Sequence, residues 1–246
     1  MLELIRKILS LFLRKKPKIN LADYPVKTDY GTLNSEQINA MDNILVACKA
    51  GEETAEIGKL TQKEFDVVMT HIGMHFGNTY LFRNIALMRR NVASINLDIY
   101  SQAREYKKEL DIRVDDVLST LYEGTIEYKL KQVCQWIAAN CKYKHGNNDV
   151  LKMLDDKGAC GAFSMLFYKM ATRLGVETHI CGGDYTDSFG RTMGHAWNMV
   201  KIDGKIYYYD ATHYDNTYMT KYIHSETPWG REYELDPFTV SYNYNK

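Results

Sequence analysis

Two stretches of the sequence decide the fold. Residues 157–170 read KGACGAFSMLFYKM, and residues 194–215 read GHAWNMVKIDGKIYYYDATHYD. The first stretch places Cys160 at the start of an apolar helical pattern. The second places His195 at the start of one β-rich run and Asp210 at the end of the next. A thiol, an imidazole and a carboxylate are the groups of a nucleophile, its base and the group that orients the base.

The residues after Cys160 predict a helix that ends at about residue 174, with Gly175 as its C-terminal cap. Apolar side chains recur there at helical spacing: Phe163, Leu166, Phe167, Met170 and Leu174. Cys160 falls in the first turn, where free N–H groups and the helix dipole favour a thiolate. A helix N-terminus and a histidine partner can lower a thiol pKa from about 8.5 to about 3–4. We therefore expect the Cys160 thiol to be reactive.

A β-hairpin is predicted at Asp203-Gly204, the strongest two-residue turn signal, between the runs 195–202 and 205–212. With that turn, strand alternation places His195 and Asp210 on the same face of the sheet. Such diagonal neighbours have backbones about 7–8 Å apart, so their side chains can meet. The pattern does not place the helix against the hairpin, so a contact between Cys160 and His195 is inferred.

These motifs resemble the transglutaminase-like superfamily, which shares a papain-like Cys-His-Asp core. The family's helix pattern C-x-x-[FY]-A-x-x-[FL] is followed by Cys160, Phe163 and Phe167, with Ser164 in place of alanine. Its H-A-W-N-x-V motif is present at residues 195–200. Its I-D-G-x-W-Y-x-x-D-x-T motif fits residues 202–212 with isoleucine at the tryptophan position, and its T-W-D-D ending reads T-H-Y-D at 212–215. The match is strong from Leu130 onward, and a looser resemblance to bacterial relatives extends back to Leu33.

The resemblance implies an α+β fold. In it, a helix bearing Cys160 packs on an antiparallel sheet bearing His195 and Asp210, and a helical region precedes this core. We predict three segments: a basic amphipathic helix at 1–18, a helical region at 19–121 and the transglutaminase-like core at 122–246. Within the helical region, N-cap signals at Asn34-Ser35 and Thr61 begin two periodic stretches, 33–51 and 60–76.

The predicted chemistry is acyl transfer on protein or peptide carboxamides through a thioester. Cys160 attacks the carbonyl, His195 holds the ion pair and protonates the departing amine, and Asp210 fixes the imidazole tautomer. Attack on the thioester by an amine gives crosslinking, and attack by water gives deamidation or peptide hydrolysis. The alternative is a catalytically silent domain of the same family that acts as an interaction scaffold.

Further site residues are expected around this triad. Trp197 is a candidate for substrate binding, and the backbone N–H of Cys160 is one oxyanion donor. Gln135 and Trp136 are candidates for the second donor because they lie upstream. No cofactor or metal is predicted. His71 and His75 have H-x-x-x-H spacing, but no glutamate follows His71 and no third ligand is placed, which favours a half-exposed structural pair.

The cysteine content favours a reducing compartment or a free reactive thiol. The chain has 31 basic and 31 acidic residues, so no net charge favours nucleic acid as a partner. Its five cysteines are odd in number and include no C-x-x-C pair, which argues against a disulfide framework. We expect a cytoplasmic location, with the cysteines other than Cys160 buried as small apolar groups.

Three more segments carry expectations. Residues 1–18 predict either a basic helix on a membrane surface or a helix packed on this protein or a partner, and the apolar run 8–13 is too short to span a bilayer. Residues 184–194 are polar, with glycine near both ends, and predict a mobile loop before His195. The tyrosine-rich segment after Asp215 predicts a strand that closes the sheet or, as the alternative, an aromatic binding surface.

Overall fold

The fold is known from a computed structural model that describes residues 18–21, 33–77, 86–88, 91–187, 189–214 and 233–235. The predicted basic helix lies outside the described residues except for Lys18, as does most of the tyrosine-rich segment. The described helices are α2 (Ser35–Ala50), α3 (Gln62–Phe76), α4 (Leu97–Leu118), α5 (Ile126–Asn140), α6 (Val150–Asp155), α7 (Cys160–Arg173) and α8 (Ala211–Tyr214). This is the expected mixture of helices and antiparallel sheet.

The strands form three sheets. A three-stranded antiparallel sheet has the order β1 (Thr54–Glu56), β3 (Val92–Ser94), β2 (Ala86–Met88). A parallel pair joins β4 (Lys142–Tyr143) to β5 (Lys157–Gly158). The largest, antiparallel sheet has the order β8 (Lys205–Tyr209), β7 (Thr192–Ile202), β6 (Glu177–Thr186), β9 (Tyr233–Leu235).

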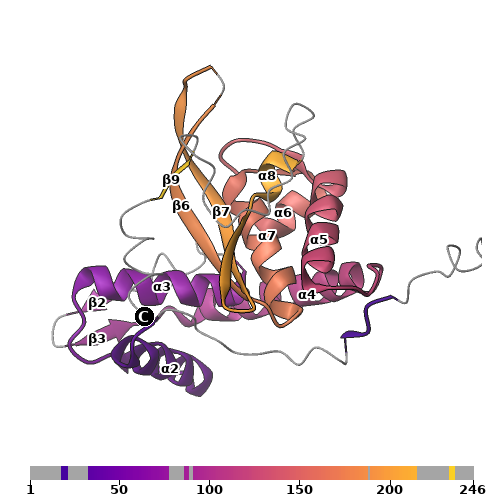
Figure 1. Cartoon of the computed structure of the whole chain (residues 1–246). Coiled ribbons are helices and arrows are strands. Elements are labelled where there is room, and N and C mark those ends of the chain that lie inside the picture. Colours follow the sequence, from indigo (N-terminus) through magenta and orange to yellow (C-terminus); the bar gives the residue numbers. More distant parts are fainter. Residues whose placement is uncertain are drawn as a thin grey trace, which may run out of the picture.

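The N-terminal elements surround a hydrophobic core of their own, built by α2, α3 and the small sheet (Figure 1). Both helices begin at capping boxes, in which the Asn34 and Thr61 side chains accept from the backbone and a side chain three residues later closes the box. Gly51 and Gly77 end them in the left-handed conformation that glycine adopts most readily. The predicted starts of these two helices are thus confirmed.

A second core lies between α7 and one face of the large sheet, with α5 on the other side of α7 (Figure 1). The apolar face predicted for α7 is buried in this core, with Phe163, Leu166, Phe167 and Met170 fully enclosed. Phe167 stacks on Tyr209 of β8 with ring centroids 5.3 Å apart. This packing fixes the orientation of α7 on the sheet, which the sequence pattern did not provide.

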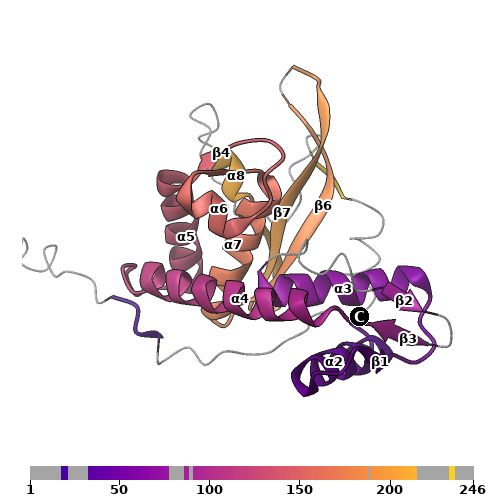
Figure 2. The same ribbon diagram turned by 180° about the vertical axis from the view of Figure 1, so that it is seen from behind.

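Helix α4 contributes to both cores. Its first half buries Tyr100 and Ala103 with the N-terminal elements, and its second half buries Leu110, Val114 and Leu118 with α5 and α7. Seen from behind, α4 runs along the molecule between these two parts (Figure 2). The segment predicted to end at residue 121 therefore shares its last helix with the core that follows.

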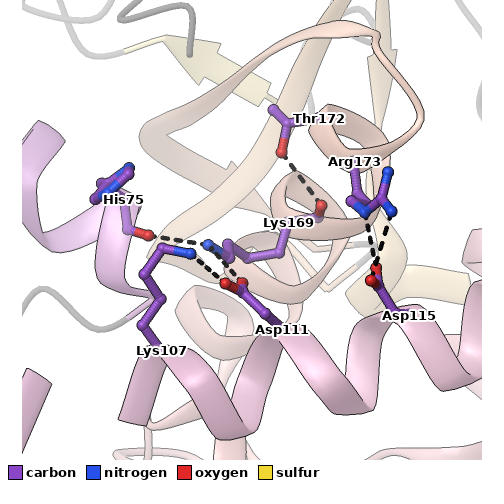
Figure 3. Close-up of polar contacts among 7 residues, drawn as sticks. All are labelled: His75, Lys107, Asp111, Asp115, Lys169, Thr172 and Arg173. Carbon is purple, nitrogen blue, oxygen red and sulfur yellow. Dashed lines mark hydrogen bonds and ion pairs between the residues drawn. The ribbon is translucent and has the colours of Figure 1, made fainter. Parts of the chain in front are cut away.

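Polar contacts also join α7 to α3 and α4 (Figure 3). The Lys169 Nζ donates to the His75 carbonyl at 2.9 Å and lies 3.4 Å from Asp111 Oδ1, and Asp111 also pairs with Lys107. Arg173 Nε donates to Asp115 Oδ1 at 2.8 Å. Burial, the largest influence on Lys169, lowers its pKa to about 8. The buried Lys169 ammonium therefore lies at the C-terminus of α3, where the helix dipole favours a positive charge.

The segment predicted as a mobile loop is instead the outer part of a β-hairpin. Strands β6 and β7 pair without interruption from Glu177↔Lys201 to Thr186↔Thr192, and the hairpin projects beyond the body of the molecule (Figure 1). Asp187 holds the connecting turn, because its carboxylate accepts the Arg191 backbone N–H at 2.9 Å and the Arg191 Nε at 2.7 Å. Residues 189–194 are exposed, which accounts for their polar sequence, whereas Tyr185 of the same segment is buried.

Part of the segment after Asp215 is a strand, as the first of its two interpretations predicted. Tyr233–Leu235 forms β9 and pairs antiparallel with β6 through Tyr185↔Tyr233 and Gly183↔Leu235. Across the described residues, no helix has the length and apolar character needed to cross a membrane.

Candidate active site

Cys160 is the first residue of α7. The N-cap residue, Ala159, makes no side-chain capping bond, and its own N–H donates to the Asn147 carbonyl at 2.5 Å. Just before it, Gly158 of β5 pairs with Tyr143 of β4. Backbone contacts therefore hold the residues just before α7. The free N–H groups of its first turn lie at the N-terminus, where Cys160 is.

The predicted hairpin and its register are confirmed. Asp203 and Gly204 have φ values of +50° and +78°, and the pairs Ile202↔Lys205 and Val200↔Tyr207 are those expected from a two-residue turn. Asp210 follows directly after β8. His195 Nε2 lies 2.7 Å from Asp210 Oδ2, so the two side chains share a face and a hydrogen bond.

The His195 side chain lies close enough to the Cys160 thiol to act on its pKa. Because Nε2 of His195 faces Asp210, its Nδ1 is the ring nitrogen left for the sulfur. Burial acts to raise the thiol pKa, but the hydrogen bond and charge of His195 and the backbone N–H groups of Ala196 and Gly161 outweigh it. The pKa of Cys160 therefore lies below its usual value.

The charges along this chain of contacts support one another. Burial disfavours the imidazolium of His195, but the charge of Asp210, its hydrogen bond and Cys160 prevail and raise the pKa of His195 to about 10. Burial likewise disfavours the carboxylate, and His195 and His213 nevertheless hold the pKa of Asp210 well below its ordinary value. A thiolate, an imidazolium and a carboxylate are the protonation states that these shifts favour at neutral pH.

This geometry has a counterpart among known protein families. A sequence model of the transglutaminase-like superfamily matches residues 115–211, which include Cys160, His195 and Asp210. Residues 115–211 form a transglutaminase-like domain. Members of this superfamily are typically enzymes with cysteine-protease-like chemistry. The match confirms the resemblance predicted from the motifs around the three residues.

Solved structures include a similar protein from Cytophaga hutchinsonii that is provisionally named a cysteine protease. The two share 19% sequence identity and a TM-score of 0.35, over 43% of this chain and 37% of that protein. The match thus spans little more than a third of the Cytophaga protein. Among curated proteins, none matches this chain.

Within the transglutaminase-like domain, Asp210 contacts a second imidazole that the sequence analysis did not include. His213 Nδ1 lies 2.6 Å from Asp210 Oδ2, the same oxygen that faces His195. His213 belongs to the short helix α8 and stands where the family usually has tryptophan. That departure, three residues after the aspartate and so on the same side of a helical turn, was the available signal for its position.

His195, Asp210 and His213 are also close enough together to be considered as metal ligands. Their separations of 2.7 and 2.6 Å are those of hydrogen bonds. Ligands at about 2.0–2.1 Å from a tetrahedral Zn²⁺ stand roughly 3.3 Å apart. The arrangement therefore fits shared protons better than a shared ion, and no step below depends on a metal.

The burial of Trp197 disagrees with its predicted contact with substrate. The side chain is fully buried among Cys181, Met199 and Tyr208 on the sheet face away from α7. Its ring stacks with His195 at a centroid distance of 6.0 Å. The Trp197 ring therefore packs against the His195 imidazole and has no exposed surface that a substrate could contact.

The two oxyanion candidates on α5 are not oriented alike. Cys134 faces Asp210 closely enough for the carboxylate charge to act on it, so the next residue, Gln135, turns away and is exposed. Trp136 packs against the second core, the one between α7 and the large sheet. The groups that act on the Cys160 thiol are His195, Ala196 and Gly161. A second oxyanion donor on α5 stays a prediction.

Two other polar side chains lie near the thiol. Burial, followed by the negative charges of Cys160 and Asp210, raises the pKa of Tyr143, which places its phenol beside the site. A Cβ at Gly161 would lie 2.5 Å from Asn148 Oδ1, so the glycine allows Asn148 to pack against the first turn of α7. Both residues come from the segment after α5, whose position beside α7 depends on the β4–β5 pair.

His71 and His75 are part of the packing between α3 and its neighbours. His71 is buried, and His75 packs edge-on against Phe76 with ring centroids 5.1 Å apart. Within the described ranges, neither belongs to a cluster of three metal-ligating groups. The predicted half-exposure is wrong for His71, because that side chain packs inside the protein.

Proposed function

We propose that this protein is a cysteine-dependent acyl-transfer enzyme that acts on protein or peptide carboxamides or peptide bonds. The observation that carries the proposal is the hydrogen bond between His195 and the buried Asp210, beside the Cys160 thiol at the start of α7, whose pKa His195 lowers. A thiol lowered in pKa by a histidine that is itself held by a carboxylate is the arrangement of an activated nucleophile. The chemistry of the superfamily supports the same reading.

The proposed reaction begins with attack of the Cys160 thiolate on the substrate carbonyl carbon. The oxyanion of the tetrahedral intermediate accepts hydrogen bonds from the N–H groups at the start of α7. The intermediate collapses as the C–N bond breaks, and the leaving nitrogen takes the proton from His195. A thioester of Cys160 and neutral His195 remain. His195 then removes a proton from water or an amine, which attacks the thioester and restores the thiolate and the imidazolium.

The second step decides between crosslinking, deamidation and peptide hydrolysis. An acceptor amine gives a new amide, and water gives a carboxylate. Mass spectrometry of a labelled protein substrate separates these outcomes by mass, because transamidation adds the amine and hydrolysis adds water. A scaffold without catalysis is the competing proposal, and it requires Cys160 to be no more reactive than the other thiols.

Selective alkylation of Cys160 is the direct test. At pH 6 we expect iodoacetamide to modify Cys160 first, because its thiol pKa is lowered while burial raises that of Cys48 to about 11 and those of Cys134 and Cys181 as well. Peptide mapping by mass spectrometry measures the modification at each site. Cys160→Ala should remove the fast modification together with any turnover. Equal rates at all five cysteines would contradict the proposal.

We further propose that residues 1–18 bind a membrane surface or a partner protein without taking part in the chemistry. Buried apolar area and about 1 kcal/mol per basic residue near anionic lipid would supply the affinity. A chain starting at Lys18 keeps the Lys18–Tyr122 bridge and the buried Ile19. It should fold and keep the reactivity of Cys160, yet lose binding to anionic vesicles at low salt in a sedimentation assay. A large fall in the melting temperature would instead make the segment part of the fold.

A further inference from the structure

We propose that His213 is a positioning residue of the active site, which holds the Asp210 carboxylate in place for His195 through an Nδ1–H···Oδ2 hydrogen bond. The site is then a chain of four side chains, with Asp210 between two imidazoles. This inference rests on the proposed function for its catalytic consequence, whereas the contact itself can be tested without any turnover.

The carboxylate of Asp210 is fully buried and receives four hydrogen bonds. On Oδ2, His195 Nε2 lies at 2.7 Å and His213 Nδ1 at 2.6 Å. On Oδ1, the backbone N–H groups of Thr212 and His213 donate at 2.9 and 3.3 Å. A buried carboxylate has to have its lone pairs satisfied, and here His213 supplies two of the four donors.

The His213 ring is held by its own neighbours. It lies three residues after Asp210 on the single turn of α8, with its side chain 9% exposed. Its centroid is 4.3 Å from the Tyr185 ring of β6 and 4.8 Å from the His195 ring. These contacts enclose the ring, and its Nδ1 points at the carboxylate. A family-typical tryptophan would place an indole here, whose N–H sits differently on the ring.

The contact requires a proton on Nδ1 of His213. Asp210 is a carboxylate and has no proton to give, so the proton of the short Nδ1···Oδ2 contact belongs to the ring. The other ionisable groups facing this cluster are Tyr185 from β6, Tyr143 from β4, Cys134 from α5 and Cys160 from α7, none of which adds a positive charge.

Nitrogen NMR of the ¹⁵N-histidine-labelled full chain tests the contact directly. At pH 7 we expect Nδ1 of His213 to carry a proton that resonates far downfield, because its hydrogen bond to Asp210 is short. Asp210→Asn should abolish the downfield signal. A His213 ring without a proton on Nδ1 in the wild-type protein would overturn the proposal.

Two variants test the consequence for the thiol. His213→Phe keeps a ring against Tyr185 but has no donor, and His213→Asn places an amide N–H close to the position of Nδ1. At pH 6 we expect the Phe variant to be alkylated at Cys160 about tenfold to a hundredfold more slowly, the range for a lost hydrogen bond to a charged group, and the Asn variant to stay within about threefold of wild type. Rates are normalised to folded protein by near-UV circular dichroism.

The outcomes separate the two proposals. Equal losses in the Phe and Asn variants would show that the donor is not what matters, and the positioning role would be wrong. If wild-type Cys160 showed no selective reactivity while the NMR spectra gave a proton on Nδ1 of His213, the proposed enzyme would be wrong and the Asp210–His213 contact would stand.

Discussion

Asp210→Asn is expected to lower turnover by about 10²- to 10⁴-fold, and to slow the alkylation of Cys160 at pH 6. Both oxygens of the carboxylate accept hydrogen bonds from two donors each. An amide has one accepting oxygen, so whichever way it turns, its NH₂ group meets two N–H groups. The variant also removes the charge that raises the pKa of His195, and the thiolate loses its imidazolium partner.

The same substitution should lower the free energy of unfolding by roughly 3–5 kcal/mol, the range for removing one partner of a buried charged pair. Urea unfolding at pH 7 measures this quantity. Asp203→Asn is the matched control, because it makes the same chemical change in the turn of the same hairpin. Asp203 has φ +50°, a conformation that asparagine accepts, so stability and reactivity should be unchanged. If Asp210→Asn behaved like this control, Asp210 would not be the partner of His195.

Acidification from pH 6.5 to pH 4 is expected to destabilise the protein strongly through His71 and His75. Burial, followed by the charge of His179, lowers the pKa of His71 to about 4. Burial, followed by Lys169 and Lys107, lowers the pKa of His75 to about 4. In this window the unfolded chain takes up protons at both rings and the folded protein does not. Stability therefore falls as pH falls, by up to about 3 kcal/mol for each histidine.

Urea midpoints measured at intervals from pH 7 to pH 4 would give the size of this effect. The double variant His71→Gln, His75→Gln carries side chains that do not titrate, so its midpoint should change much less between pH 6.5 and 4.5. His145→Gln removes an exposed histidine and should keep the wild-type pH dependence. A double variant as acid-sensitive as wild type would show that these rings are not buried in their neutral form.

Local signals predicted much of this site. The Asp203-Gly204 turn specifies the register of β7 and β8, and the register alone puts His195 and Asp210 on one face. The spacing of apolar residues after Cys160 predicts both the start of α7 and its buried face. These features depend on residues close in sequence, which is why a single chain reveals them.

Features that depend on tertiary packing were missed or misjudged. The motif around Trp197 predicted a substrate-binding residue, yet its side chain is fully buried. Within residues 184–194, Tyr185 is buried but residues 189–194 are exposed, so the sequence lacks apolar alternation and a strand resembled a loop. The contact of Lys169 with the His75 carbonyl joins positions 94 residues apart, and no local pattern predicts a buried lysine there.

Helix α4 has a consequence for how the molecule folds. Fixing the backbone of a helix costs conformational entropy, about 1–2 kcal/mol per residue. Because α4 buries Tyr100 and Ala103 in one core and Leu110, Val114 and Leu118 in the other, whichever core assembles first has already ordered part of the helix that the other requires. The two halves should therefore melt as one cooperative unit, and a ligand that tightens either half would stiffen the other through α4 without any change in shape.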